Sequence, residues 1–264
     1  MIRVEDIRVT FNAGSAMETI ALHDLQLTIP AGEFVTVIGS NGAGKSTLLN
    51  VIAGETRCDS GRILIEETDV TGWSTARRSA LVARVFQDPM AGICENLTLE
   101  ENLALASSRG CRRGLAYAVD YDRLDEFQQK IAQLGLGLDT RLNDRMGLLS
   151  GGQRQAVSLM MATINPMKIL LLDEHTAALD PKTAAFVMAL TDRIVRELSL
   201  TTLMVTHSMR QALDHGDRTV MLHEGRVVLD VSGNERRRMK VEELLHMFEQ
   251  IRGRELDDDK LLLG

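Results

Sequence analysis

Two adjacent carboxylates, Asp173 and Glu174, follow directly after the apolar run ILLL at residues 169–172. An apolar run of this length predicts a strand that is buried on both faces. Because a buried charge is unfavourable unless another group pairs with it, the two acids need a partner. Taken alone, the pattern fits a strand that ends in solvated acids equally well.

The segment GSNGAGKST at residues 39–47 supplies a partner, because it fits the pattern G-x-x-x-x-G-K-[S/T] between an apolar strand and a helix. Glycines let the backbone amides of such a loop surround phosphate oxygens, and the N-terminus of the following helix adds favourable partial charge. Lys45 is expected to reach the β- and γ-phosphates of ATP, and the Ser46 hydroxyl is expected to bind Mg²⁺. The predicted nucleotide-binding residues of this loop are Gly39, Ser40, Asn41, Gly42, Ala43, Gly44, Lys45, Ser46 and Thr47.

This loop explains the two acids. A P-loop nucleotidase needs a second strand that ends in an acid holding the Mg²⁺ shell, and Asp173 ends such a strand. The charge of the bound Mg²⁺ makes a carboxylate tolerable at that position. We therefore expect Asp173 at the metal, and Glu174, which points differently, at the attacking water.

The elements that must position these groups follow an α/β pattern with a helical interruption. Residues 61–71 are expected to form one strand followed by a turn, and residues 90–166 are mainly helical. Thr98 and Glu101 have the spacing of a capping box. Further strands are predicted at residues 2–11, 20–29, 34–39, 80–88, 169–173 and 201–207, with a hairpin at 219–233, and further helices at 45–53, 183–199 and 208–216.

The segment LLSGGQRQAVSLMMA at residues 148–162 opens a helix whose first-turn amides are free to bind phosphate. It resembles the signature motif of ATP-binding cassette (ABC) ATPases. Gln87 in VFQDP resembles the Q-loop glutamine of that family, residues 178–180 (ALD) its D-loop, and His207 in VTHS its switch histidine. Phe11 stands where the family has its adenine-stacking aromatic residue, although a place in the core of the first strand is an alternative. The resemblance covers about residues 2–233.

The resemblance implies an α/β fold: a P-loop NTPase (RecA-like) core with an N-terminal antiparallel β subdomain and an inserted α-helical subdomain. The core would comprise residues 1–89 and 167–233, the helical signature subdomain residues 90–166, and a C-terminal helical tail residues 234–264. The implied functional form is a head-to-tail dimer of two copies of the chain around two ATP. In that dimer each nucleotide lies between the P-loop of one subunit and the SGGQ residues of the other, which are Ser150, Gly151, Gly152 and Gln153.

The resemblance also implies a role for each remaining motif residue. Glu174 would be the general base, and Gln87 would contact Mg²⁺ and the attacking water. His207 would contact the γ-phosphate, and Asp180 would couple the two sites of the dimer. The chain departs from the family at His175, where most members have proline; we favour a structural role for this histidine, although it can titrate near neutral pH.

Composition excludes several function classes. The net charge is −7 and the sequence pI is near 5.4, which argues against a nucleic-acid partner. Cys58, Cys94 and Cys111 form no paired motif, and the sequence shows no apolar run long enough to span a membrane. We expect a cytoplasmic chain. The arginines at 112–113 and 236–238 are expected to be solvated.

These features predict the ATPase subunit of an ABC transporter, and an importer rather than an exporter. It would sit on the inner face of the cell membrane through an integral membrane permease, and indirectly serve a substrate-binding protein. The segments ENLALASSRG at residues 101–110, GLLSGGQRQA at 147–156 and DEHTAALDPKTA at 173–184 resemble a bacterial branch with members linked to amino acid uptake. Met90 and Ile93 are candidates for the permease contact or for the core of the helical lobe. The alternative is a soluble ABC ATPase of a cofactor-assembly system with no membrane partner.

Overall fold

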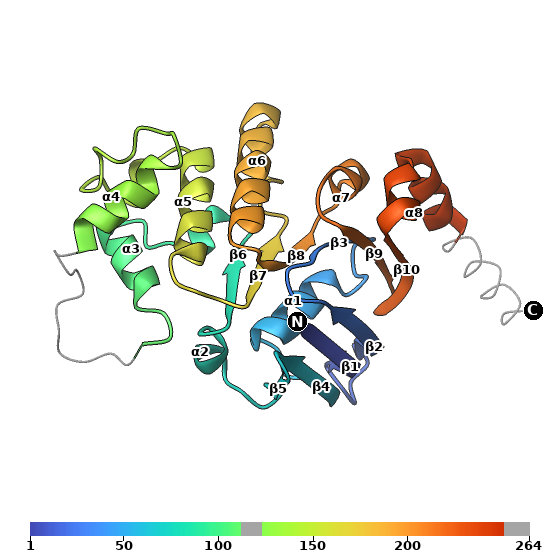
Figure 1. Ribbon diagram of the computed structural model, residues 1–264. Coiled ribbons are helices and arrows are strands. Elements are labelled where there is room, and N and C mark those ends of the chain that lie inside the picture. Colours follow the sequence, from blue (N-terminus) through green and yellow to red (C-terminus); the bar gives the residue numbers. More distant parts are fainter. Residues whose placement is uncertain (112–122, 251–264) are drawn as a thin grey trace, which may run out of the picture.

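The central element of the fold is a mixed sheet with helices on both faces, seen in a computed structural model that describes residues 1–111 and 123–250 (Figure 1). Within those ranges the strand order is β10-β9-β3-β8-β7-β6, parallel from β9 to β6, with β10 antiparallel to β9. The strands are β3 (Phe34–Gly39), β6 (Val82–Val85), β7 (Ile169–Asp173), β8 (Thr201–Val205), β9 (Arg218–His223) and β10 (Arg226–Ser232). The α/β class predicted from the sequence is confirmed.

A second, antiparallel sheet has the order β2-β1-β4-β5 and is built from β1 (Ile2–Phe11), β2 (Thr19–Ile29), β4 (Ser60–Ile65) and β5 (Thr68–Asp69). The prediction of one strand over residues 61–71 is wrong, because the chain turns back between β4 and β5. Glu66 and Glu67 make that turn with φ of 49° and 66°, in the left-handed region that ends a strand.

Helix α1 (Lys45–Ala53) lies between the two sheets (Figure 1). Its apolar residues, such as Leu48 and Ile52, share one buried cluster with Ile2 of β1, Val37 of β3 and Leu171 of β7. Burial on both sides fixes the helix relative to β3 and β7. Since α1 carries Ser46 and β7 carries Asp173, this packing sets the distance between the P-loop and the acids.

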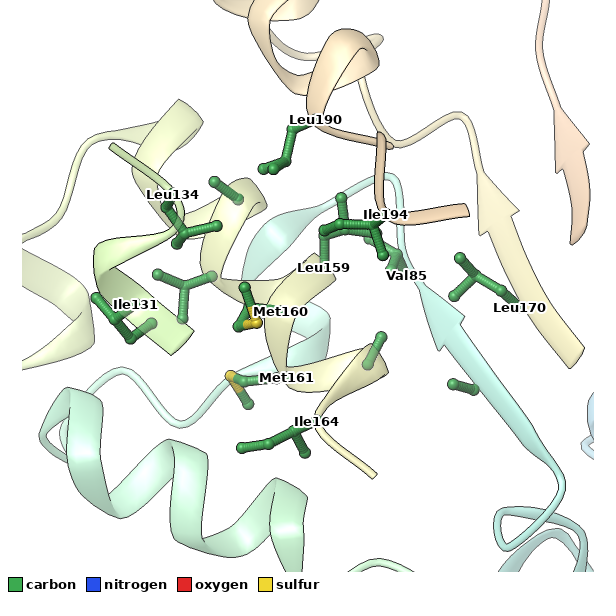
Figure 2. Close-up of a cluster of buried hydrophobic side chains, with 14 of the residues drawn as sticks. Val85, Ile131, Leu134, Leu159, Met160, Met161, Ile164, Leu170, Leu190 and Ile194 are labelled. Atoms are coloured by element: carbon green, nitrogen blue, oxygen red, sulfur yellow. The ribbon is translucent and has the colours of Figure 1, made fainter. Parts of the chain in front are cut away.

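The opposite face of the central sheet is covered by α5 (Gly151–Thr163) and α6 (Pro181–Glu197). One continuous apolar cluster runs from Val85 and Leu170 of the sheet, through Leu159 of α5, to Ile131 of α4 (Leu124–Ala132) (Figure 2). The helical region therefore has no core of its own that is separate from the sheet. It also contains η1 (Pro89–Gly92), α3 (Leu99–Ser107) and η3 (Met146–Leu148).

Two local expectations in the helical region have a clear outcome. Thr98 and Glu101 form the capping box of α3, with Glu101 N donating to Thr98 Oγ1 at 3.2 Å and Thr98 N donating to Glu101 Oε2 at 2.7 Å. Ile93 packs against the buried cluster of the lobe. Arg112 and Arg113 lie outside the described residues, as does the end of the tail from residue 251.

The tail after β10 packs against strands β3 and β9 of the central sheet. Helix α8 (Gly233–Arg238) is followed by a helical segment at residues 241–250, whose Leu244 is fully buried beside Ile38 and Met221. Arg236 is buried, so its predicted solvation is wrong. Its guanidinium donates to the carbonyls of Ala212 and His215 and to Thr219 Oγ1. Ala212 belongs to α7 (Met209–Asp214), His215 follows that helix, and Thr219 belongs to β9.

His175 joins the end of β7 to helix α6. The ring is buried, and its Nε2 lies 3.0 Å from Thr191 Oγ1. Because the Thr191 hydroxyl donates to Val187 O at 2.8 Å, it accepts from His175 Nε2–H, which fixes the tautomer. The pKa of His175 is lowered from 6.5 to about 4, mainly by burial and to a smaller extent by the charge of His215, while Asp192 opposes the change. The ring is therefore a neutral structural contact at neutral pH.

This burial predicts a pH-dependent stability. The unfolded chain binds a proton at His175 below about pH 6.5, whereas the folded chain resists protonation until about pH 4. The free energy of unfolding should therefore be unaffected above pH 6.5 and fall between pH 6.5 and 4, by on the order of 3 kcal/mol at the lower end. Denaturant unfolding of the wild type and of His175→Gln across this range measures the effect, because the variant should lose this part of the slope. His246→Gln, at an exposed position, is the control, and an equal slope in all three proteins would contradict the assignment.

Candidate nucleotide-binding site

Four parallel strands end at the same edge of the central sheet and bring the predicted groups together. The P-loop follows β3, Gln87 comes two residues after β6, Asp173 and Glu174 end β7, and His207 comes two residues after β8. The carboxyl edge of a parallel sheet is where such folds bind ligands, because loops rather than packed helices cover it. These residues are far apart in the sequence, and the strand order alone makes them neighbours.

A cleft of about 480 Å³ opens at this edge. Thr19 and Ala21 of β2 form part of its wall and were missed from the sequence, where they are ordinary members of an alternating strand. Phe11 is 41% exposed at the mouth of the cleft, so its alternative place in the core is excluded. The lining residues are Phe11, Thr19, Ala21, Asn41, Gly42, Ala43, Gly44, Lys45, Ser46, Thr47, Gln87, Glu174 and His207.

The P-loop is held open by close backbone packing. Gly44 precedes α1 with φ of 96°, and a Cβ there would lie 2.5 Å from Ala21 O. Gly39 is as constrained, since its Cβ would lie 2.2 Å from Leu222 O of the neighbouring strand β9. Only glycine fits at these two positions, which gives the motif a steric reason as well as a phosphate-binding one.

Lys45 is folded back onto its own loop. Its Nζ donates to Gly39 O at 2.9 Å and to Ser40 O at 2.8 Å, and only 5% of the residue is exposed. Burial lowers the pKa of this ammonium, and the negative charges of Glu174 and Asp173 oppose that change. The loop therefore presents a desolvated cation at its centre, beside two carboxylates.

Glu174 pairs with His207 across the cleft. His207 Nε2 lies 2.6 Å from Glu174 Oε1, and the Glu174 side chain is only 8% exposed while that of His207 is 50% exposed. Glu174 has φ of 46°, an unfavourable conformation for a residue with a side chain, and its amide donates to Val205 O of β8 at 3.0 Å. This bend turns Glu174 away from the direction of Asp173 and toward the cleft.

Asp173 is bound on the other side, by an arginine that the sequence did not single out. Arg84 Nη2 lies 2.6 Å from Asp173 Oδ2. The only sequence signal for this pairing is a charged residue inside the otherwise apolar strand of residues 82–85. Asp173 itself does not line the cleft.

The SGGQ segment and Asp180 lie outside the cleft. Ser150 caps α5 by accepting from Gln153 N at 3.3 Å, and Asp180 caps α6 by accepting from Thr183 N at 3.1 Å. The two helix starts touch, because a Cβ on Gly152 would lie 2.1 Å from Thr183 Cγ2. One chain therefore has two separate surfaces with phosphate-binding character, and the second does not face its own P-loop.

The donor set formed by Ser46 in the cleft and Asp173 beside it suits a hard divalent cation bound together with phosphate. Ser46 and Asp173 offer a hydroxyl and a carboxylate, the oxygen ligands that Mg²⁺ prefers, and too few for a complete protein cage. Within residues 1–111 and 123–250 no group of three or more His, Cys, Asp or Glu residues has metal-binding geometry. Among the same residues, no helix is long and apolar enough to cross a membrane.

The family model for ABC transporters matches residues 22–177. The tyrosine transport ATP-binding protein of Clostridioides difficile is 44% identical over 249 residues, which is 94% of this chain and 99% of that protein. The phosphonates import ATP-binding protein PhnC of Frankia casuarinae is 37% identical, over 81% of this chain and 85% of that protein. The methionine import ATP-binding protein MetN of Rhizobium johnstonii is 36% identical, over 86% of this chain and 60% of that protein.

Solved structures give the same result. The dimeric structure of a post-hydrolysis state of the ATP-binding cassette MJ0796, bound to ADP and Pi, matches with a TM-score of 0.75 at 28% identity. The match covers 88% of this chain and 98% of that chain. The family model, the curated relatives and the solved structures agree, and the chain belongs to the ABC transporter family as one of its ATP-binding cassettes.

Proposed function

We propose that this ATPase drives an importer as a head-to-tail dimer, with Mg²⁺-bound ATP at each site and an amino acid as the transported substrate. The single observation that carries the proposal is the gathering of the P-loop, Gln87, Glu174 and His207 around one cleft. ATP binding and hydrolysis follow from membership of the family. The metal, the residue roles and the substrate are the proposed parts.

The chemistry assigned to the chain's own residues follows from their positions. Lys45 leaves the carbonyls of Gly39 and Ser40 to bind the β- and γ-phosphates, where its charge is worth most because the loop is desolvated. Glu174 accepts a hydrogen bond from the attacking water, or its proton, and His207 donates to the γ-phosphate. Ser46 and Asp173 would hold Mg²⁺, which would supply positive charge at the phosphates.

The pairing of Glu174 with His207 describes a resting arrangement. His207 Nε2 and Glu174 Oε1 lie 2.6 Å apart, which leaves Glu174 Oε2 for a water. A γ-phosphate in the cleft would compete with Glu174 Oε1 for the hydrogen bond that His207 donates. Glu174 would then present both carboxylate oxygens to the attacking water.

The second copy supplies what one chain lacks. The SGGQ segment begins the thirteen-residue helix α5, yet it lies away from the cleft of its own chain. A partner related by a two-fold axis can place this helix end over the exposed phosphate side of the cleft. The solved relative described above is also a dimer.

The surface assigned to the permease is a groove of about 710 Å³ between the end of β6 and the helical region. Phe86 and Pro89 line it on one side and Arg109 and Ser158 on the other. Arg109 Nη2 and Ser158 Oγ are buried there without a hydrogen-bond partner among the described residues. Because such groups are unfavourable unless paired, the docked segment is expected to bring a polar group to them.

The catalytic assignment predicts that Glu174→Gln slows ATP turnover by roughly 10²- to 10⁴-fold, the usual effect of removing a positioned acid or base. The amide keeps the shape of the side chain, so ATP binding should persist and ATP-bound dimers should accumulate on size exclusion. Glu197→Gln, an exposed change on α6, is the control. Full-rate hydrolysis by the Glu174 variant would remove this residue from the mechanism.

The P-loop assignment predicts that Lys45→Ala weakens ATP binding about 10- to 100-fold, the loss expected for a charge-assisted hydrogen bond in a desolvated site. Isothermal calorimetry measures this directly. Lys168→Ala removes an exposed lysine at the opposite edge of the sheet and should bind ATP as the wild type does. Equal ATP affinities in the wild type and both variants would contradict the assignment of Lys45 to phosphate binding.

The substrate proposal is tested by reconstitution. The chain, its permease and the associated substrate-binding protein would be placed in liposomes, and ATPase stimulation measured with tyrosine, methionine and phosphonate. Stimulation by one of the amino acids is expected, because the relative that spans nearly the whole chain is named for tyrosine transport. Stimulation by phosphonate alone would overturn the amino acid assignment, and failure to form any membrane complex would overturn the transport assignment.

A further inference from the structure

Arg84 joins three elements of the site through one buried guanidinium. Its side chain is 9% exposed. Nη2 donates to Asp173 Oδ2 on β7 at 2.6 Å, while Nη1 donates at 2.7 Å to Asn50 Oδ1 on α1 and at 2.7 Å to Glu55 Oε2 just beyond α1. Such a fork of donors can serve two acids and an amide at once, which a lysine ammonium on a flexible stem matches poorly.

Strand register is what brings Arg84 to Asp173. In the parallel pairing of β6 with β7, Arg84 stands opposite Leu171. Asp173 comes two residues later and therefore points to the same face of the sheet as Leu171. Leu171 belongs to the buried cluster around α1, so both Arg84 and Asp173 are directed toward that helix.

The partner on α1 is placed one turn from the predicted metal ligand. Asn50 follows Ser46 by four residues in the helix, so the two lie on one face. Arg84 thus holds the carboxylate of Asp173 and the side of α1 that carries Ser46 with two adjacent nitrogens. These are the two protein groups that the proposed function places around Mg²⁺.

The second carboxylate oxygen of Asp173 fits this arrangement. Arg84 takes Oδ2, and among the described residues no hydrogen bond reaches Oδ1. Lys45, the other nearby cation, is occupied by the carbonyls of Gly39 and Ser40. One carboxylate oxygen is therefore fixed by the protein while the other is free to face a metal-bound water.

We propose that Arg84 is a positioning residue of the hydrolytic site, which sets Asp173 and the Ser46 side of α1 in the relative position that the Mg²⁺–nucleotide complex requires. The assignment rests on the proposed function. Arg84 does not line the cleft and acts through the orientation of Asp173. Partners that orient metal-binding carboxylates in this way typically change metal affinity by 10- to 100-fold when they are removed.

The test compares Arg84→Met, Arg84→Lys and a matched control, Arg236→Met. The control also removes a buried arginine with three hydrogen-bond partners, but neither Arg236 nor any of these partners lines the cleft. Two quantities are measured: the affinity for ATP with Mg²⁺ and with EDTA by calorimetry, and the free Mg²⁺ concentration that gives half-maximal hydrolysis at saturating ATP. Thermal unfolding of each protein reports the loss of stability separately.

The expected result is a selective loss of Mg²⁺ dependence. Arg84→Met should raise the half-maximal Mg²⁺ concentration about 10-fold and reduce the Mg²⁺-dependent gain in ATP affinity, with ATP binding in EDTA within about twofold of wild type. Arg84→Lys keeps the charge, so its half-maximal Mg²⁺ concentration should lie between those of the wild type and Arg84→Met. This variant also keeps the test possible if Arg84→Met does not fold. Arg236→Met should lower the unfolding temperature without changing either Mg²⁺ quantity.

Two outcomes would overturn the proposal. If both Arg84 variants lose stability as Arg236→Met does and keep the wild-type Mg²⁺ dependence, Arg84 is only a structural contact. If they need less Mg²⁺ than the wild type, the guanidinium competes with the cation and does not position its ligand. A wild-type chain whose ATP binding gains nothing from Mg²⁺ would instead refute the proposed function, so the two failures are distinguishable.

Discussion

The interaction on which the rest of this structure depends is the neutralisation of two adjacent acids at the end of one buried strand. Asp173 and Glu174 are 14% and 8% exposed in their side chains, and each has a cationic or potentially cationic partner on a different side. Arg84 comes from β6 and His207 from the loop after β8, so the strands on both sides of β7 supply the charges. An unpaired buried carboxylate would be strongly destabilising. The strand order that gives each acid its partner is therefore required both for the stability of the fold and for the assembly of the site.

This constraint makes the resting site a set of exchangeable pairs. Lys45 donates hydrogen bonds to carbonyls of its own loop, and Glu174 pairs with His207. In the proposed mechanism, each of these pairings would give way to a phosphate or a water when nucleotide binds. The pairing of Arg84 with Asp173 differs, because it leaves one carboxylate oxygen free and is tied to α1 through Asn50. The site therefore combines partners that must be displaced with one that can stay in place.

Local patterns predicted the groups that lie next to one another in the sequence. The P-loop, the capping box of Thr98 and the hairpin at residues 224–225 each depend on a few neighbouring residues, and all have the expected form. The pairing of Arg84 with Asp173 depends on the register of two strands 89 residues apart in the sequence, which no local pattern specifies. Arg236 was placed in solvent for the same reason, since the carbonyls that bury it belong to other elements.

The position of the SGGQ segment follows from packing that the sequence could not reveal. The buried cluster ties α5 to α6 and to the sheet, for example through Leu159 and Leu190 (Figure 2). The start of α5 lies against the start of α6, with Gly152 next to Thr183. Ser150 and Asp180 therefore cap neighbouring helices on one surface. Helix α5 belongs to the helical region and α6 to the core, so this contact joins the two parts of the chain. In the proposed head-to-tail dimer, a partner subunit that receives the SGGQ end over its nucleotide would meet Asp180 at the same interface. Two motifs on one packed contact would then allow a single rigid element to respond to both sites.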